Sequence, residues 1–176
     1  MQKLTHEQIL KLRESNKELD RLPVCLLLDN IRSSYNVGSM FRVADGARLE
    51  RILLTGITSS PDNIKVKKTA LGAEETVPWE YHVEAVSAVE KLSRQGYQII
   101  ALEHTQNSQV HCEFNYSFPL CLVLGNEVNG VDPKLIAHAD DSIEIPMLGE
   151  KNSLNVSTAG SIAIYEILRQ YTQKAK

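Results

Sequence analysis

Three segments rich in Asn, Gly and Ser contain most of the residues whose types could do chemistry in this chain. They span residues 29–45, 124–132 and 145–157, and each begins where a short apolar run ends. In doubly wound α/β folds the strands end at a common edge of the sheet, and ligands bind beyond that edge. We therefore expect the three segments to form one ligand site.

These segments match none of the common nucleotide-binding or hydrolase motifs. The sequence has no GxGxxG after the first apolar run and no GxxxxGK[ST], which disfavours Rossmann dehydrogenases and P-loop NTPases. Ser33, Ser153 and Ser157 lack a GxSxG context, and the five histidines show no metal-ligand spacing. The three cysteines form no CxxC pair, so we expect neither a disulfide nor a metal.

The elements that must position these segments alternate between apolar runs and amphipathic stretches. A capping box of Thr5 and Gln8 predicts a first helix that ends near Asp20. We expect Asn36 to cap the next helix and Gly46 to end it in a left-handed turn. The remaining pattern predicts strands over 24–28, 51–55, 98–102, 120–124 and 142–145, an extended segment over 76–81, and helices from 62 or 63 to 72, over 84–95, over 132–139 and from 156 onwards.

This order predicts an α/β fold with a mostly parallel sheet and helices on both faces. With 176 residues, 43% hydrophobic and 23% charged, the chain is expected to form a single domain, 1–176, with an N-terminal helical extension over 1–21. It contains no apolar run long enough for a membrane span and no signal peptide, so we expect a cytoplasmic protein.

The formal net charge of −3 disfavours general binding of polyanions, because such affinity grows with the number of phosphates that Lys and Arg neutralise. Any nucleic-acid surface must therefore be local. The densest basic cluster consists of Lys65, Lys67 and Lys68. Other loops could bring Arg32, Arg42 and Lys151 next to it. A solvated helix face is the alternative interpretation of the lysine cluster.

Taken together and in this order, the three segments resemble the signature motifs of the SpoU/TrmH family within the SPOUT methyltransferases. The resemblance covers roughly Val24 to Leu168. It implies transfer of a methyl group from S-adenosyl-L-methionine to the ribose 2′-hydroxyl of a structured RNA, tRNA or rRNA, by a homodimer. It also implies a deep C-terminal trefoil knot over about 120–170, a rare exception to the rule against threaded connections.

Two other functions remain open at this point. A catalytically silent knotted module could hold RNA or a protein partner, although it would not need all of the motif residues. An ordinary doubly wound enzyme would instead bind NAD or ATP. The sequence does not identify the target RNA or nucleotide, a required partner protein, or the acceptor of the 2′-hydroxyl proton.

The resemblance places the methyl donor among backbone groups of the strand-end loops. The residues implied are Leu102, Glu103, Gly125, Ile145 and Met147, with Leu154 packing on the adenine. Backbone hydrogen bonds and apolar walls suit an uncharged adenine and a sulfonium, and glycines such as Gly125 and Gly149 allow a close approach of the main chain. The alternative is that these glycines only shape turns.

The resemblance also implies a catalytic group of five residues. Arg42 matches the essential arginine of the family; because a guanidinium stays protonated, we expect it to bind the adjacent phosphate and to stabilise a developing alkoxide. Asn36 caps its helix, takes part in catalysis, or both, and Glu127 orients Asn36, Arg42 or a backbone amide of a neighbouring subunit. Asn155 would cap the final helix, and Ser153 would contact the ligand or the partner chain.

Overall fold

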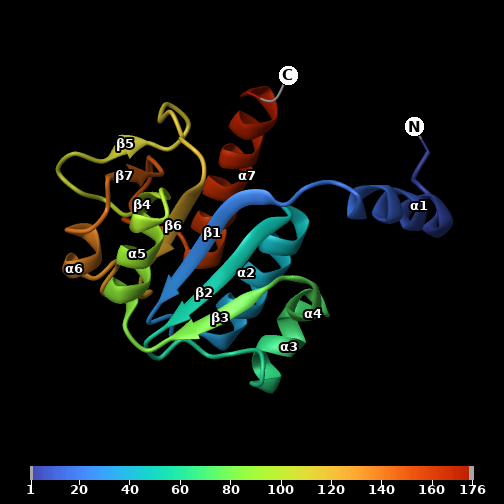
Figure 1. The fold of residues 1–176 in the computed structure, drawn as a ribbon, viewed down its shortest axis with the longest axis horizontal. Helices are drawn as coiled ribbons and strands as arrows, with labels where there is room; N and C mark the ends of the chain where they lie inside the picture. Colours follow the sequence, from blue (N-terminus) through green and yellow to red (C-terminus); the bar gives the residue numbers. More distant parts are fainter. Residues whose placement is uncertain (1, 175–176) are drawn as a thin grey trace.

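The strands and helices alternate along the chain as the apolar pattern predicts (Figure 1). A computed structural model describes residues 2–174. In chain order the elements are α1 His6–Lys17, β1 Leu22–Asp29, α2 Ser34–Gly46, β2 Leu49–Thr55, α3 Ile64–Ala70, α4 Ala73–Thr76, β3 Trp79–His82, α5 Ala85–Arg94, β4 Gln98–Leu102, β5 Gln109–Val110, β6 Leu120–Leu124, α6 Pro133–Ile136, β7 Asp141–Glu144 and α7 Val156–Lys174.

The strands form one seven-stranded sheet in the order β3-β2-β1-β6-β4-β7-β5, and every pair of neighbours is parallel. β1 lies between β2 and β6, so that Leu26 pairs with Ile52 on one side and with Leu122 on the other. Because all strands run the same way, their carboxyl ends share one edge. The loops after β1, β4, β6 and β7 meet at that edge.

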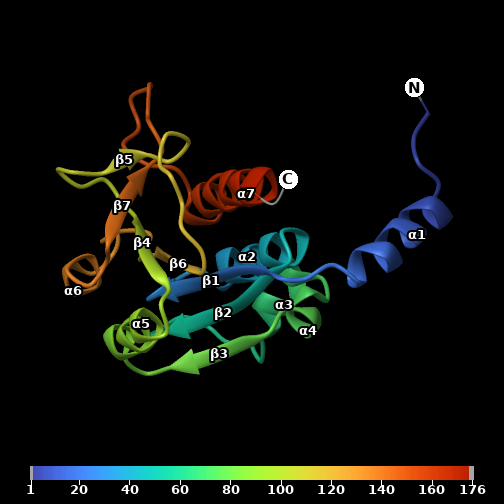
Figure 2. The same cartoon turned by 45° about the horizontal axis from the view of Figure 1, so that its top comes forward.

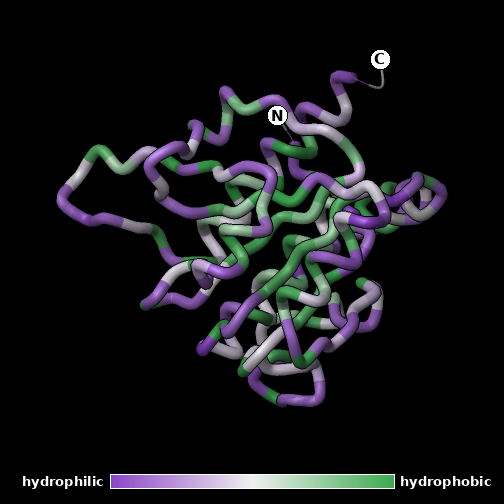
Figure 3. The backbone as a smooth tube through the Cα atoms, turned by 60° about the vertical axis from the view of Figure 1, so that its left-hand side comes forward, coloured by the Kyte–Doolittle hydropathy of each residue, from purple (hydrophilic) through white to green (hydrophobic). Residues whose placement is uncertain are grey.

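Helices cover both faces of this sheet, as Figure 2 shows. Along β1, Val24, Leu26 and Leu28 pack into a cluster with α2, α3, α4 and α7, whereas Cys25 and Leu27 pack into a second cluster with α5 and α6. Strands buried on both faces carry continuous apolar runs, which explains the hydrophobic colouring of the central strands in Figure 3. Burial, together with nearby acidic charge, raises the pKa of the Cys25 thiol to about 12, so this thiol is an inert core group.

Two predictions about α2 are wrong, and the physical reason is local. Ser33 caps the helix by accepting the backbone N–H of Asn36 at 3.4 Å, so Asn36 lies inside the first turn and its side chain is free for other contacts. Gly46 is the last helical residue, and the left-handed conformation falls on Arg48, with φ 55°. Apart from β4, β6 and the start of α7, the predicted ends of the elements shift by up to three residues. The short elements α4 and β5 were not predicted, and Thr76, expected to be extended, is the last residue of α4.

α1 stands apart from the rest of the fold in both ribbon views (Figures 1 and 2). Its capping box is confirmed, because Thr5 N–H donates to Gln8 Oε1 at 2.9 Å and Gln8 N–H donates to Thr5 Oγ1 at 3.3 Å. Within residues 2–174, none of the helices combines the length and the apolar character that crossing a membrane requires.

Candidate active site

A cavity of about 540 Å³ lies beyond the carboxyl ends of β4, β6 and β7, beside the first turn of α7. A volume of this size is typical of small-molecule sites. Its lining includes all six residues that the sequence predicts for the methyl donor, which are Leu102, Glu103, Gly125, Ile145, Met147 and Leu154. Register and strand order therefore bring together segments that lie far apart in the sequence.

The loop after β6 has a conformation that only its particular residues allow. Asn126 and Gly130 exchange two backbone hydrogen bonds of 2.9 Å, and the Asn126 side-chain oxygen accepts the N–H groups of Val128 and Asn129. A Cβ on Gly125 would lie 2.3 Å from backbone atoms of Gly130 and of the next residue. Gly125 is therefore required because the two strands of this tight loop touch. Gly149 differs, since no atom of the described chain lies within 4 Å of its Cβ position and it is not among the residues that line the cavity, so its close approach to the donor stays a prediction.

Glu103 ties the end of β4 to the same loop. One carboxylate oxygen accepts the N–H of Val131 at 2.8 Å, and the other accepts the N–H of His104 at 2.9 Å. A Cβ on Gly130 would come within 2.1 Å of this carboxylate. Glu103 lines the cavity, and both of its carboxylate oxygens accept backbone N–H groups that belong to the cavity wall.

Glu127 fastens the loop after β6 to the start of α2. Its carboxylate accepts the N–H groups of Arg32 at 2.8 Å and Ser33 at 3.0 Å, and the side-chain amide of Asn36 at 2.9 Å. Partial burial alone would raise the pKa of Glu127, but these hydrogen bonds outweigh burial and lower that pKa. A carboxylate beside a helix N-terminus is also favoured by the helix dipole. Glu127 therefore fixes where α2 begins.

Asn36 also links α2 to the residue before the last helix, α7. Its side-chain oxygen accepts the amide of Asn155 at 3.1 Å. The Asn155 side-chain oxygen accepts the N–H groups of Ser157 at 2.9 Å and Thr158 at 3.3 Å, which confirms the predicted cap of α7. The three motif segments are thus joined by one chain of hydrogen bonds from Glu127 through Asn36 to Asn155.

Arg42 and the cavity are not brought together within one chain. Arg42 is exposed on α2, is absent from the cavity lining, and makes no side-chain hydrogen bond or ion pair with any residue of the described chain. Ser153, Glu127 and Asn155 do line the cavity, whereas Asn36 contacts it only through its two partners. The predicted catalytic group is therefore split, with Arg42 on a separate surface.

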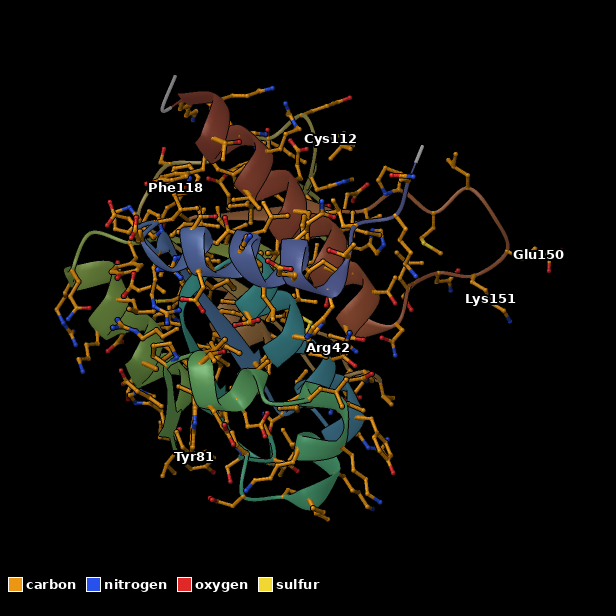
Figure 4. The ribbon with its side chains drawn as sticks, turned by 90° about the vertical axis from the view of Figure 1, so that its right-hand side faces the viewer. Arg42, Tyr81, Cys112, Phe118, Glu150 and Lys151 are labelled. Atoms are coloured by element: carbon orange, nitrogen blue, oxygen red, sulfur yellow. The ribbon has the colours of Figure 1, made fainter. Side chains whose placement is uncertain are left out.

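The predicted basic cluster is assembled in part. Lys65, Lys67 and Lys68 are exposed on α3, which packs so closely on α2 that a Cβ on Gly38 would lie 2.4 Å from a carbonyl oxygen of α3. Arg32 and Arg42 lie before and on α2, so they share this side of the fold. Lys151 does not join them: Figure 4 shows it with Glu150 at the tip of a loop that projects away from α2.

The cavity lining carries acidic residues and no Lys or Arg. Besides Glu103 and Glu127 it includes His104 and Glu144, whose side chains approach to 3.3 Å. Hydrogen bonds from Ser108 and then His104 lower the pKa of Glu144. No local pattern in the sequence predicts this pair, because only the pairing of β4 with β7 brings the two residues together. Among residues 2–174, no three His, Cys, Asp or Glu side chains cluster as metal ligands would.

Comparisons with known proteins agree on one family. The model of the SpoU rRNA Methylase family matches residues 23–165. The 23S rRNA (guanosine-2′-O-)-methyltransferase RlmB of Pseudomonas aeruginosa is 30% identical over 161 residues, which are 92% of this chain and 64% of that protein. This chain likewise spans 61% of RlmB from Pectobacterium atrosepticum, at 32% identity over 85% of this chain. It therefore spans less than two thirds of the length of these curated relatives.

Solved structures share the fold over most of this chain. The A. aeolicus TrmH/SpoU tRNA modifying enzyme superposes with a TM-score of 0.84 at 28% identity, covering 96% of this chain and 85% of that one. The AdoMet-bound rRNA methyltransferase from Sinorhizobium meliloti superposes with a TM-score of 0.77 at 26% identity, covering 86% of this chain and 61% of that one. The parallel sheet and its flanking helices are common to all three.

Proposed function

This chain belongs to the SpoU rRNA methylase family, and from that premise we propose that it transfers the methyl group of S-adenosyl-L-methionine to the ribose 2′-hydroxyl of a structured RNA, tRNA or rRNA. The observation that carries the proposal is the cavity at the sheet edge. Its wall contains all six residues expected at the donor, and its rim is joined to α2 by Glu127, Asn36 and Asn155.

The chemistry of the cavity fits this methyl donor. Leu102, Leu124, Met147 and Leu154 provide apolar walls for an adenine ring, and the backbone of the loop after β6 offers polar groups at close range. The donor carries a sulfonium and an ammonium group, which an acidic lining without Lys or Arg tolerates. The related S. meliloti protein has been solved with AdoMet bound.

The role of this chain in methyl transfer is to align and to stabilise. When bound, the donor would supply an electrophilic methyl group: its bond to sulfur would break as the new bond to the ribose oxygen forms, S-adenosylhomocysteine would leave, and the hydroxyl proton would pass to water. Because a guanidinium stays protonated, Arg42 is not the proton acceptor. Arg42 binds the phosphate beside the target ribose and stabilises negative charge that develops on the 2′-oxygen. In-line alignment of that oxygen supplies much of the remaining rate enhancement.

The separation of Arg42 from the cavity supports a homodimer in which Arg42 of one subunit serves the cavity of the other. A two-fold dimer is the commonest oligomer, and α7 carries the exposed apolar side chains Ile162 and Tyr165 that an interface would cover. A complementation assay tests this arrangement. A mixture of inactive Arg42→Ala and Gly125→Ala subunits regains methyl transfer if Arg42 acts across the interface, and stays inactive if it acts within its own chain.

We also propose that residues 120–170 form a deep trefoil knot. Support comes from the strand order, in which β6 is inserted between β1 and β4, and from the shared fold with solved SpoU-type structures. An experimental structure tests it directly. A chain path in which residues 120–170 thread a loop fits the proposal, and an unthreaded path contradicts it.

Incubation of the purified protein with total RNA and donor labelled in the methyl group tests the activity. Digestion to nucleosides should place the label on ribose, as a 2′-O-methylnucleoside, and calorimetry should detect binding of S-adenosylhomocysteine. Label on a base would contradict the reaction class. Donor binding without any labelled RNA would favour the silent module, and binding of NAD or ATP alone would favour an ordinary nucleotide enzyme. Since the substrates are tRNA or rRNA, we also propose a cytoplasmic location, which cell fractionation tests.

A further inference from the structure

An exposed tyrosine shares the helix face of Arg42. Tyr35, Ser39 and Arg42 follow the i, i+4, i+7 spacing, so their side chains lie along one side of α2. The opposite side is buried through Val37 and Phe41, among others. Arg42 follows Tyr35 by seven positions, which places their Cα atoms about 10 Å apart along the axis. An RNA strand that runs along α2 and contacts Arg42 through a phosphate would therefore pass within reach of the tyrosine ring.

The Tyr35 side chain is exposed, while its backbone is firmly held. The side chain is 51% exposed, and its hydroxyl has no hydrogen-bond partner within the described part of the chain. In contrast, the Thr69 hydroxyl lies 3.2 Å from the carbonyl oxygen of Tyr35 and 3.4 Å from that of Lys65. The neighbouring Ser34 hydroxyl lies 2.9 Å from that of Ser59. A rigid scaffold thus presents a flat ring to solvent.

The surroundings of this ring are basic. Arg32 lies three residues before Tyr35, Arg42 lies two turns after it, and Lys65 lies on the adjacent helix; all three are exposed and none forms an ion pair with a residue in 2–174. Two acids lie near this end of α2. The oxygens of Glu127 already accept three N–H groups, and Asp62, which is exposed before α3, accepts the Ser60 hydroxyl at 3.1 Å. An unpartnered aromatic ring among free cations has the composition of a single-stranded nucleic-acid site.

We propose that Tyr35 is a stacking site for an unpaired base that lies within one nucleotide of the methylated ribose. This inference rests on the proposed function, since it assumes that RNA binds across α2. The phosphates contact Arg42 and the neighbouring cations, and the base lies flat on the tyrosine ring. Stacking tolerates any base because every base has a π-face, so Tyr35 contributes affinity and orientation to RNA binding without selecting a sequence.

Two substitutions separate stacking from the hydroxyl group. Tyr35→Phe keeps the ring and should bind RNA as the wild type does, whereas Tyr35→Ala should weaken RNA binding about tenfold or more. S-adenosylhomocysteine affinity should be unchanged in both variants. Tyr81→Ala is the matched control, because Tyr81 is 49% exposed and lies on β3 at the sheet edge, away from Arg42 (Figure 4).

A spectroscopic probe reports the stacking itself. Once the methylated nucleotide has been mapped, 2-aminopurine is placed at it or at either neighbour in a short RNA. At one of these positions, the wild type and Tyr35→Phe should quench the fluorescence, and Tyr35→Ala should not. Equal quenching by Tyr35→Ala, or RNA affinity equal to the wild type, would overturn the inference.

Two further outcomes would also overturn the inference, and one failure concerns the proposed function alone. If Tyr35→Ala turned a dimer into monomers by size-exclusion chromatography with light scattering, the ring would be an interface residue instead. If Tyr35→Ala lowered the melting temperature and unfolding accounted for its loss of RNA affinity, the role of Tyr35 would be structural. If the wild type labelled no RNA, the proposed function would fail before Tyr35 came into question.

Discussion

The cavity at the sheet edge and the outer face of α2 and α3 differ in nearly every physical respect. The cavity is lined by apolar side chains, backbone groups and acids, with no Lys or Arg among the described residues that line it, and Glu103 and Glu127 are bound to N–H groups of the protein. The outer face carries exposed cations that form no ion pair with residues 2–174, namely Arg32, Arg42, Lys65, Lys67 and Lys68. One region suits a small cationic ligand and the other suits a polyanion.

This difference fits the proposed function, in which one small domain handles two substrates of opposite charge. A preorganised cavity would bind the donor without attracting phosphates, and the basic face would attract RNA without filling the cavity. The two regions meet at Asn36, which bonds Glu127 on one side and Asn155 on the other. Substitutions should therefore separate donor binding from RNA binding, except at this junction.

The largest effect is expected at Arg42. Arg42→Ala should lower the rate of methyl transfer by roughly 10²–10³-fold, the usual cost of removing one group that stabilises transition-state charge. Donor affinity, measured by calorimetry with S-adenosylhomocysteine, should not change because Arg42 does not line the cavity. Arg94→Ala, on α5 at the opposite face of the sheet, is the matched control. Full activity of Arg42→Ala would refute this role.

The second largest effect is expected from a substitution that causes a backbone clash in the cavity wall. In Gly125→Ala the new Cβ would lie 2.3 Å from backbone atoms of Gly130, so the loop must shift. We expect donor affinity to fall at least about tenfold, and the free energy of unfolding to fall by about 1–3 kcal/mol. Gly149→Ala is the control, because nothing lies within 4 Å of its Cβ position. Unchanged donor binding by Gly125→Ala would mean that this loop does not shape the site.

Glu127, which binds Asn36 where the two regions meet, should contribute an intermediate amount of folding stability that depends on pH. Glu127→Gln places an amide against the N–H groups of Arg32 and Ser33, so the free energy of unfolding at neutral pH should fall by about 1 kcal/mol. Because the folded-state pKa of Glu127 is lowered from 4.5, its contribution is complete above pH 4.5 and is lost as pH falls through the folded-state pKa.

Denaturant titrations at several pH values measure this difference. The stability gap between the wild type and Glu127→Gln should be constant near neutrality and should close in acid. Glu113→Gln, an exposed acid on another loop, should show no such gap. A gap that persisted well below the folded-state pKa would show that Glu127 acts through packing and not through its charge.

The smallest effect is expected on the outer face. Lys65→Ala should weaken RNA binding only a few-fold and should reduce the slope of log affinity against log salt by about one. Lys91→Ala, on α5, removes the same charge from the other face and should change neither quantity. Filter binding or fluorescence anisotropy over a range of salt concentrations measures both. Identical slopes for the two lysine variants would remove α3 from the RNA surface.

The sequence predicted the parallel sheet well, because its strands are buried on both faces and carry unbroken apolar runs. The limits of β4 and β6, for example, were predicted to the residue. The sequence also predicted that the loops after these strands meet, since parallel strands end at one edge, and a cavity lies there. That the cavity holds the methyl donor stays a proposal, because the six residues expected there came from the family resemblance. The first turn of α2 was mispredicted because Ser33 and Asn36 are both good caps, and only the contact with Glu127 decides between them.

Other features depend on contacts that no local pattern encodes. His104 and Glu144 meet only through the pairing of β4 with β7. Lys151 was grouped with the other cations by charge alone, although its loop leads away from them (Figure 4). The separation of Arg42 from the cavity is likewise a matter of how α2 packs, since the sequence specifies only its spacing from Asn36.

Donor affinity and RNA affinity, measured side by side on Arg42→Ala and Gly125→Ala, test the division of tasks most directly. The account predicts opposite patterns: Arg42→Ala binds S-adenosylhomocysteine as the wild type does but binds RNA more weakly, whereas Gly125→Ala keeps its affinity for RNA and binds S-adenosylhomocysteine at least about tenfold more weakly. If each variant lost both affinities to the same extent, the cavity and the outer face would be one site, and the account would be contradicted.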